Sequence, residues 1–191
     1  MKYDYIAIPE SEIPETAEPA YQHLVDTYVS EANKVCSIWK AVPDRLLSYK
    51  PHEASNDVQM IMKHQLLSER RFFAQFVGTS EPEVDTLLPR KAQPLVADYL
   101  EKYLEQIHGR LPQIAVATPG WWLEEHPFFG FQRQRIWTFW RRVLHTCHHR
   151  TQIQTYLRLA GEKTPAIYGP SGDVTWEDAD PTYSTAAAQR S

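Results

Sequence analysis

The most informative part of the chain reads Leu144-His145-Thr146-Cys147-His148-His149-Arg150-Thr151-Gln152, with three histidines within five residues. Apolar residues recur around it at helical spacing, so it is predicted to lie in a long amphipathic helix. Residues four apart on a helix are neighbours on one face, with Cβ atoms about 5–6 Å apart. His145 and His149 can therefore direct their imidazoles at one metal ion, as in the H-E-x-x-H motif of metalloproteases. Thr146 stands where that motif has its glutamate, so the spacing indicates metal binding without protease chemistry.

Four segments of the chain, including this one, have apolar residues at helical spacing and are predicted to be helices. They lie at about residues 15–41, 58–77, 92–108 and 131–159. Pro43, Gly78 and Gly161 stand where the first, second and fourth of them end. Four helices of this length with short or medium connections predict an all-α fold, an up-down four-helix bundle.

The chain has 191 residues, of which 42% are hydrophobic, enough for one globular domain with a core. We expect a single domain over residues 1–191, with the bundle at about 15–161 and an irregular C-terminal tail at 162–191. A long loop, residues 109–130, is expected between the third and fourth helices. No alternating apolar pattern with turn residues stands out, so no β-hairpin is expected.

The expected loop is longer than a simple connection needs, and aromatic residues gather in it and just after it. They are Trp121, Trp122, Phe128, Phe129 and Phe131. We interpret this aromatic group as the lip of an apolar pocket. Two alternatives stay open, a cap on the open end of the bundle and a dimer interface.

Composition excludes several classes of partner. The net charge is −4 and no run of lysine and arginine occurs, so no nucleic-acid partner is expected. The N-terminus lacks the apolar run of a signal peptide, and no run of about 18 apolar residues predicts a membrane span. The two cysteines, Cys36 and Cys147, cannot form a disulfide framework, so a cytoplasmic location is expected.

A divalent ion needs at least one more ligand, and His64 is the best candidate. It lies in the second predicted helix between the core residues Ile61 and Leu67, so we expect it near the interior. Together with His145 and His149 it would make a three-histidine set, which leaves positions for water or substrate as catalytic zinc sites do. The alternative is that each is a hydrogen-bonded core residue, since such pairs also arise by chance.

The other histidines carry weaker signals. His148 lies one position away from the pair and is expected either to support a ligand or to face solvent. The remaining four have no partner at ligand spacing and are interpreted as structural or exposed: His23, His52, His108 and His126.

Several polar residues and a cysteine stand next to the histidines, and each has an expected place in the bundle. Cys147 points to the other side of the helix and is predicted to be a small core residue, as is Cys36. Arg150 and Gln152 belong either to a solvated face or to a set that orients ligands or binds an anionic substrate. Glu69 stands five residues after His64, about 140° around the helix, so it is predicted to point elsewhere.

The two segments that carry His64 and the pair of His145 and His149 resemble those of a known family. The segment from Leu144 to Gly161 is similar to the last helix of the DinB-like (damage-inducible) superfamily, whose signature reads roughly H-x-x-H-H-R-x-Q before a leucine-rich turn and a glycine. His64, followed by Glu69 and two arginines, is similar to the family's second helix. The resemblance covers about residues 15–170 and departs from the signature at Thr151, where glycine is usual.

The resemblance implies a four-helix bundle, often dimeric, with a divalent ion, zinc or nickel, on His64, His145 and His149. Related proteins are thiol-dependent transferases or isomerases that use bacillithiol, mycothiol or similar low-molecular-weight thiols. The expected function is therefore that of a metal-dependent thiol S-transferase that acts on a small electrophile, in a homodimer. The alternatives are a metal-dependent hydrolase and a metal-stabilised, stress-related binding or structural protein without catalysis. A di-iron site is disfavoured because its paired Glu-x-x-His motifs are missing.

Overall fold

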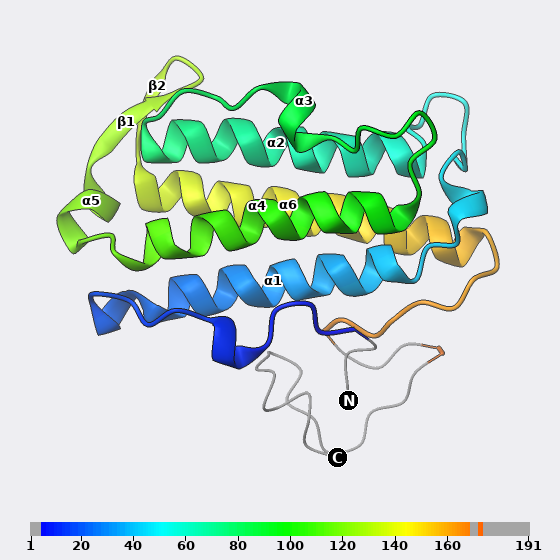
Figure 1. The fold of residues 1–191 in the computed structure, drawn as a ribbon, viewed down its shortest axis with the longest axis horizontal. Helices are drawn as coiled ribbons and strands as arrows, with labels where there is room; N and C mark the ends of the chain where they lie inside the picture. The colour runs from blue at the N-terminus through cyan, green and yellow to red at the C-terminus, as the bar shows by residue number, and fades with distance from the viewer. Residues whose placement is uncertain (1–4, 169–171, 174–191) are drawn as a thin grey trace.

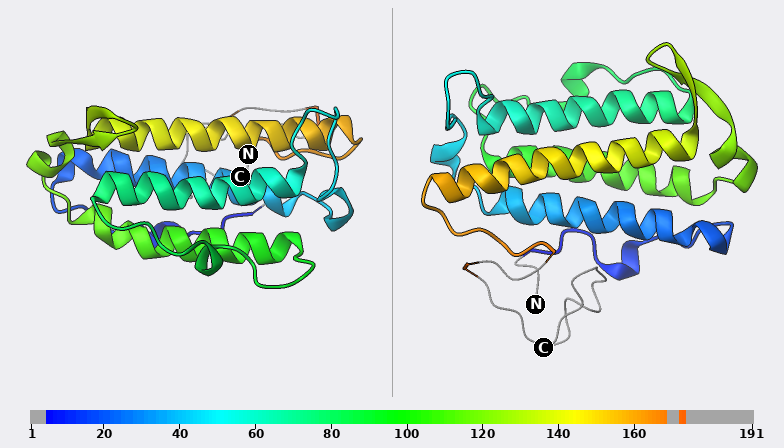
Figure 2. Two further views of the ribbon diagram at one scale, coloured as in Figure 1. Left: turned by 90° about the horizontal axis from the view of Figure 1, so that it is seen from above. Right: turned by 180° about the vertical axis from the view of Figure 1, so that it is seen from behind.

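The computed structural model describes residues 5–168 and 172–173 and confirms the predicted all-α bundle. Four long helices lie with their axes roughly aligned (Figures 1 and 2). They are α1 (Gln22–Lys40), α2 (Val58–Val77), α4 (Val96–Ala115) and α6 (Arg135–Leu159). Helix α1 packs against α4 and α6, and α2 packs against the same two helices. Helices α1 and α2 are therefore diagonal partners, and α6 lies between them.

The directions of the helices refine the expected up-down order. Helix α2 runs opposite to α1, but residues 78–95 carry the chain back along the bundle, so α4 runs in the same direction as α2 (Figure 1). This connection contains the short helix α3 (Val84–Leu87). Helix α6 then runs opposite to both, which makes the order up, down, down, up. Eighteen residues of connection are enough to span a helix of about 30 Å, so nothing forces α4 to alternate.

The helix ends follow local chemistry. Asp57 caps α2 by accepting a hydrogen bond from the backbone N–H of Met60, and Gly78 ends it with a φ of 80°. Helix α1 begins at Gln22 rather than near residue 15, because Pro19 starts a separate 3-10 turn. Helix α4 continues through Pro112 to Ala115, past its predicted end. A proline costs one backbone hydrogen bond there, and the buried apolar residues around it outweigh that loss.

A long connection does join the third and fourth long helices, but it covers residues 116–134, and the prediction that it holds no β-hairpin is wrong. After α4 the chain forms α5 (Pro119–Leu123) and a hairpin of β1 (Glu125–Phe128) and β2 (Phe131–Gln134). Phe128 pairs with Phe131, which leaves a two-residue turn. Both turn residues have positive φ, 47° at Phe129 and 84° at Gly130, as mirror-image hairpin turns require. Strands of four residues are too short to give a clear alternating pattern.

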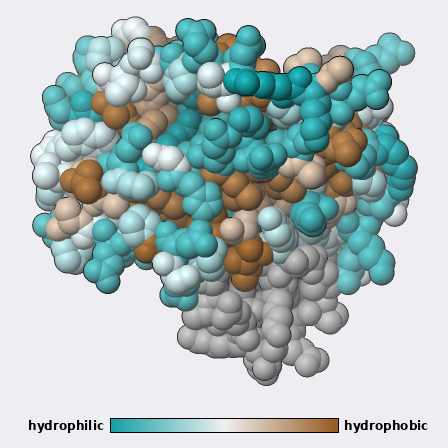
Figure 3. All heavy atoms as spheres, in the orientation of Figure 1, coloured by the Kyte–Doolittle hydropathy of each residue, from teal (hydrophilic) through white to brown (hydrophobic). Residues whose placement is uncertain are grey.

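The core lies between the four helices, and α6 faces it differently from the prediction. Apolar spacing along this helix predicts that Trp137 and Leu144 belong to its core face, but they are 43% and 62% exposed. The buried face of α6 instead carries Arg142 and Arg150 beside apolar residues such as Phe139. No helix in the described part of the chain is long and apolar enough to cross a membrane. On the face seen in Figure 3, hydrophobic residues are interspersed among hydrophilic ones.

Candidate metal centre

Three histidines from two helices converge at the seam where α2 meets α6. The Nε2 atom of His145 lies 3.2 Å from the Nε2 atom of His64 and 3.2 Å from that of His149. All three ligand nitrogens lie within 4.8 Å of one another. Helical spacing brings His145 and His149 together, and the antiparallel packing of α2 against α6 adds His64. The sequence predicted this triad, although His64 is exposed rather than interior.

The geometry of the triad fits a divalent ion. Two imidazole nitrogens at about 2.0–2.1 Å from a common tetrahedral ion are roughly 3.3 Å apart, close to the 3.2 Å found for two of the pairs here. His149 donates from Nδ1 to the side-chain oxygen of Gln152, at 2.7 Å, which leaves the Nε2 lone pair directed at the other rings. Gln152 thus fixes the ring of His149, which agrees with the sharper of the two interpretations given for it.

The rings are held in the neutral form that binds metals. Burial and the nearby Arg142 guanidinium lower the pKa of His145 to about 3. Burial also lowers the pKa of His149, to about 4, although the hydrogen bond to Gln152 acts in the opposite direction. The pKa of His64 is lowered by the same two causes as that of His145. At neutral pH each ring is therefore uncharged and has one nitrogen with a lone pair that can bind a metal.

Arg142 is the functional neighbour that the sequence did not reveal. Its Nη1 atom lies 3.3 Å from Nδ1 of His145, and it also donates to the hydroxyl of Thr146. When Nδ1 of His145 accepts this bond, the ring proton lies on Nε2, so an ion at Nε2 must displace a proton or turn the ring away from Arg142. The sequence held one signal for this contact: the arginine at position 142 lies one helical turn before His145, on the same side of the helix.

Arg142 belongs to a buried ionic group that we call the Glu69 cluster: Tyr28, Glu69, Arg110 and Arg142. The Glu69 carboxylate pairs with Arg142 and lies 2.5 Å from Nη1 of Arg110. The Tyr28 hydroxyl donates to it at 2.6 Å. Glu69 thus points into the bundle, away from the triad, as its position on α2 predicted. It reaches the triad only through Arg142.

Two members of the triad, His64 and His145, line a cleft of about 460 Å³ whose wall includes part of the aromatic group. Phe128 and Phe129 of the hairpin line the cleft and contact Phe72 of α2, with ring centroids 5.6 and 6.5 Å away. These two residues therefore form the predicted pocket lip. Trp121 and Trp122 do not line it, because they pack against Phe76 at the end of the core.

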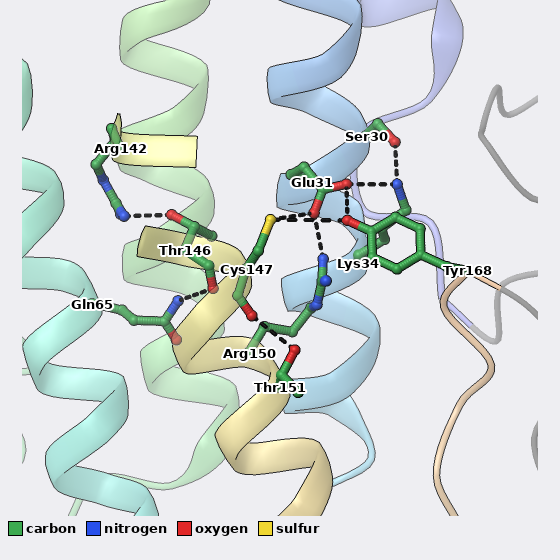
Figure 4. Close-up of polar contacts among 10 residues, drawn as sticks. All are labelled: Ser30, Glu31, Lys34, Gln65, Arg142, Thr146, Cys147, Arg150, Thr151 and Tyr168. Atoms are coloured by element: carbon green, nitrogen blue, oxygen red, sulfur yellow. Dashed lines mark hydrogen bonds and ion pairs between the residues drawn. The ribbon is translucent and has the colours of Figure 1, made fainter. Parts of the chain in front are cut away.

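A second polar group lies on the other side of α6, between α1 and residue 168, and is drawn in Figure 4. We call it the Glu31 cluster: Ser30, Glu31, Lys34, Cys147, Arg150 and Tyr168. Glu31 pairs with Arg150, and with Lys34 at 2.7 Å, while the Tyr168 hydroxyl donates to it at 2.6 Å. Burial alone would raise the pKa of Glu31, but Arg150 and Lys34 hold it at about 2.

This cluster corrects two interpretations. Arg150 neither lies on a solvated face nor contacts the triad, since it is 2% exposed and paired with Glu31. Cys147 is half-buried rather than a core residue, and its thiol donates to Glu31 at 3.0 Å. Burial and the Glu31 carboxylate raise the pKa of Cys147 to about 11, so it is a protonated thiol at neutral pH. Cys36 is a buried core residue, as predicted.

The remaining histidines lie apart from the triad. His126 is buried and bonds to the Thr138 hydroxyl at 2.9 Å, a structural role. His148 is exposed, and its ring centroid lies 4.9 Å from that of His149. The others are exposed: His23, His52 and His108.

A helical bundle with a histidine triad at one seam defines a class of proteins suited to hold a metal ion. This chain belongs to the DinB family, whose model matches residues 15–178.

Among solved structures it is similar to a DinB-like protein from Bacillus cereus ATCC 10987, with a TM-score of 0.64 and 16% identity over 76% of this chain and 95% of that chain. It is also similar to the DinB-like protein YjoA from Bacillus subtilis, with a TM-score of 0.62 and 18% identity over 76% of this chain and 97% of that chain. These two likenesses support the fold alone. No curated protein matches the chain.

Proposed function

We propose that this protein is a metal-dependent enzyme of the thiol S-transferase type, with zinc or nickel held by His64, His145 and His149. The observation that carries the proposal is the convergence of three neutral imidazoles, two of the nitrogen pairs at 3.2 Å, beside a cleft that His64 and His145 line. A divalent ion held by neutral ligands keeps its charge and lowers the pKa of a thiol or a water molecule. Membership of the DinB family agrees with such a site.

The arrangement of the protein groups supports catalysis over a purely structural ion. A structural zinc site is closed by four protein ligands, whereas three histidines are the only cluster of ligand type that the described residues offer. His64, the exposed member, leaves the cleft side accessible to a small molecule. The chain's own thiols lie away from the triad, because Cys36 is buried and Cys147 donates to Glu31 on the other side of α6. In this proposal the thiol is therefore a second, low-molecular-weight substrate.

The first test is the metal content of purified protein after incubation with zinc or nickel and removal of free ions. We expect about one equivalent in the wild type, loss of the ion in His149→Ala, and retention in His148→Ala, the matched exposed neighbour. An enzyme should also consume a small electrophile only when a thiol is supplied. Equal metal content in the wild type and His149→Ala would contradict the proposal. Unfolding of the metal-free protein, with no thiol-dependent reaction, would favour the structural alternative.

A further inference from the structure

The cleft beside the histidines is lined by more positive charge than its one acidic residue neutralises. Arg70, Arg71 and Arg141 line it together with Glu81. The Nη2 atom of Arg70 lies 2.7 Å from Glu81, so these two charges are matched. Arg71 lies 3.7 Å from the same carboxylate through Nε, a looser contact, and its side chain is 56% exposed. The cleft therefore carries an excess of two positive charges before any metal is bound.

Arg141 is the arginine of the cleft that forms no ion pair with another described residue. It is exposed on α6, and no carboxylate among the described residues lies within ion-pair distance of it. It stands four residues before His145, on the same helical face and about 6 Å along the axis. Arg71 stands seven residues after His64, which is two turns and about 10 Å along α2.

The antiparallel packing of α2 and α6 brings these two arginines to the same end of the cleft. The direction from His64 to Arg71 and the direction from His145 to Arg141 both lead toward the hairpin (Figure 1). Phe72, Phe128 and Phe129 give the cleft an aromatic wall. The Phe72 ring lies 5.5 Å from the His145 ring, and the Arg71 guanidinium lies 5.9 Å from the Phe129 ring. The cleft thus has His64 and His145 at one end, an aromatic wall, and two arginines that stand about 6–10 Å further along the helix axes.

We infer that the ligand of this cleft is a small organic carboxylate, with its acidic group at Arg71 and Arg141 and an apolar body against the three phenylalanines. A carboxylate is the planar anion that guanidinium groups bind through paired hydrogen bonds. Because the arginines stand about 6–10 Å from the histidines along the helix axes, the acid and the part of the molecule that reaches the histidines should lie at opposite ends of the ligand. The inference rests on the proposed function in naming the substrate of that same site.

The test compares 4-phenylbutanoate with its neutral isostere 4-phenylbutanamide, by calorimetric titration at low salt. The wild type should bind the acid about tenfold more tightly than the amide, because only the acid forms charge-assisted hydrogen bonds. Arg141→Gln should bring the two affinities close together. Arg90→Gln, which removes the same charge from an exposed position outside the cleft, should keep the preference.

The titrations are made on zinc-loaded and on metal-free protein. The arginines belong to the chain, so the preference for the acid should appear in both. Equal binding of acid and amide by the wild type would contradict the inference, and so would a preference that survives in Arg141→Gln. Failure to load zinc would contradict the proposed metal function alone, because the comparison of acid with amide is still made on the metal-free protein.

Discussion

The Glu69 cluster and the Glu31 cluster are built alike but serve different faces of α6. Each places one buried carboxylate between two cations and adds a tyrosine hydroxyl at 2.6 Å. The Glu69 cluster is sealed in the bundle and touches the triad through Arg142. The Glu31 cluster lies on the other side of α6 from the triad and extends to the half-exposed Cys147 and to Tyr168. The Glu69 cluster is therefore positioned to link the stability of the bundle to the histidine triad. The Glu31 cluster is positioned to hold residue 168 against the bundle.

Removal of the Glu69 carboxylate should have the largest effect on stability. Glu69→Ala leaves Arg110 and Arg142 buried without their counter-ion, which typically costs about 3–5 kcal/mol. Urea unfolding measures the loss, with the exposed Glu101→Ala of α4 as the control that should change little. A cost below about 1 kcal/mol for Glu69→Ala would show that this cluster does not hold the bundle together.

Removal of the Glu31 charge should have an effect that depends on pH. The pKa of Glu31 is lowered from 4.5 to about 2 in the folded protein, so its contribution is complete above pH 4.5 and is lost as the pH falls toward 2. The stability difference between the wild type and Glu31→Gln should shrink by up to about 1.4 kcal/mol per pH unit in that window. Urea unfolding at pH 6, 4 and 3 measures it. A stability difference that stays constant with pH would contradict the ion pairing of Glu31. Weaker zinc binding by Glu31→Gln would contradict the separation of the Glu31 cluster from the triad.

The loss of the Gln152 amide should have the smallest effect on stability and a selective effect on the site. Gln152→Leu removes the acceptor that fixes the ring of His149, and the loss of such a partner typically weakens metal binding about 10–100-fold. Competition with a chelator measures zinc affinity. Gln113→Leu, on an exposed part of α4, is the matched control. Equal affinities in the two variants would mean that Gln152 does not orient the ligand.

The sequence predicted the helices and the pair of His145 and His149 because both rest on local spacing, whereas His64 was identified from its place in the second helix and from the family resemblance. Apolar periodicity marked α1, α2, α4 and α6, and the interval between His145 and His149 placed two rings on one face. The two clusters escaped prediction because arginine on an amphipathic helix normally indicates solvent. Arg150 finds its partner 119 residues away, which no local pattern reveals. The direction of α4 and the hairpin were missed for a related reason, since a long connection allows either direction and four-residue strands give little periodicity.

The most direct test of the central claim is X-ray absorption at the zinc edge, recorded on loaded protein with and without a small thiol such as 2-mercaptoethanol. An accessible three-histidine centre should show nitrogen and oxygen neighbours alone without the thiol, because no cysteine among the described residues lies in the triad. With the thiol present, one sulfur neighbour should appear at about 2.3 Å. A spectrum that the thiol leaves unchanged, or one with sulfur neighbours before it is added, would contradict an open histidine centre built for thiol chemistry.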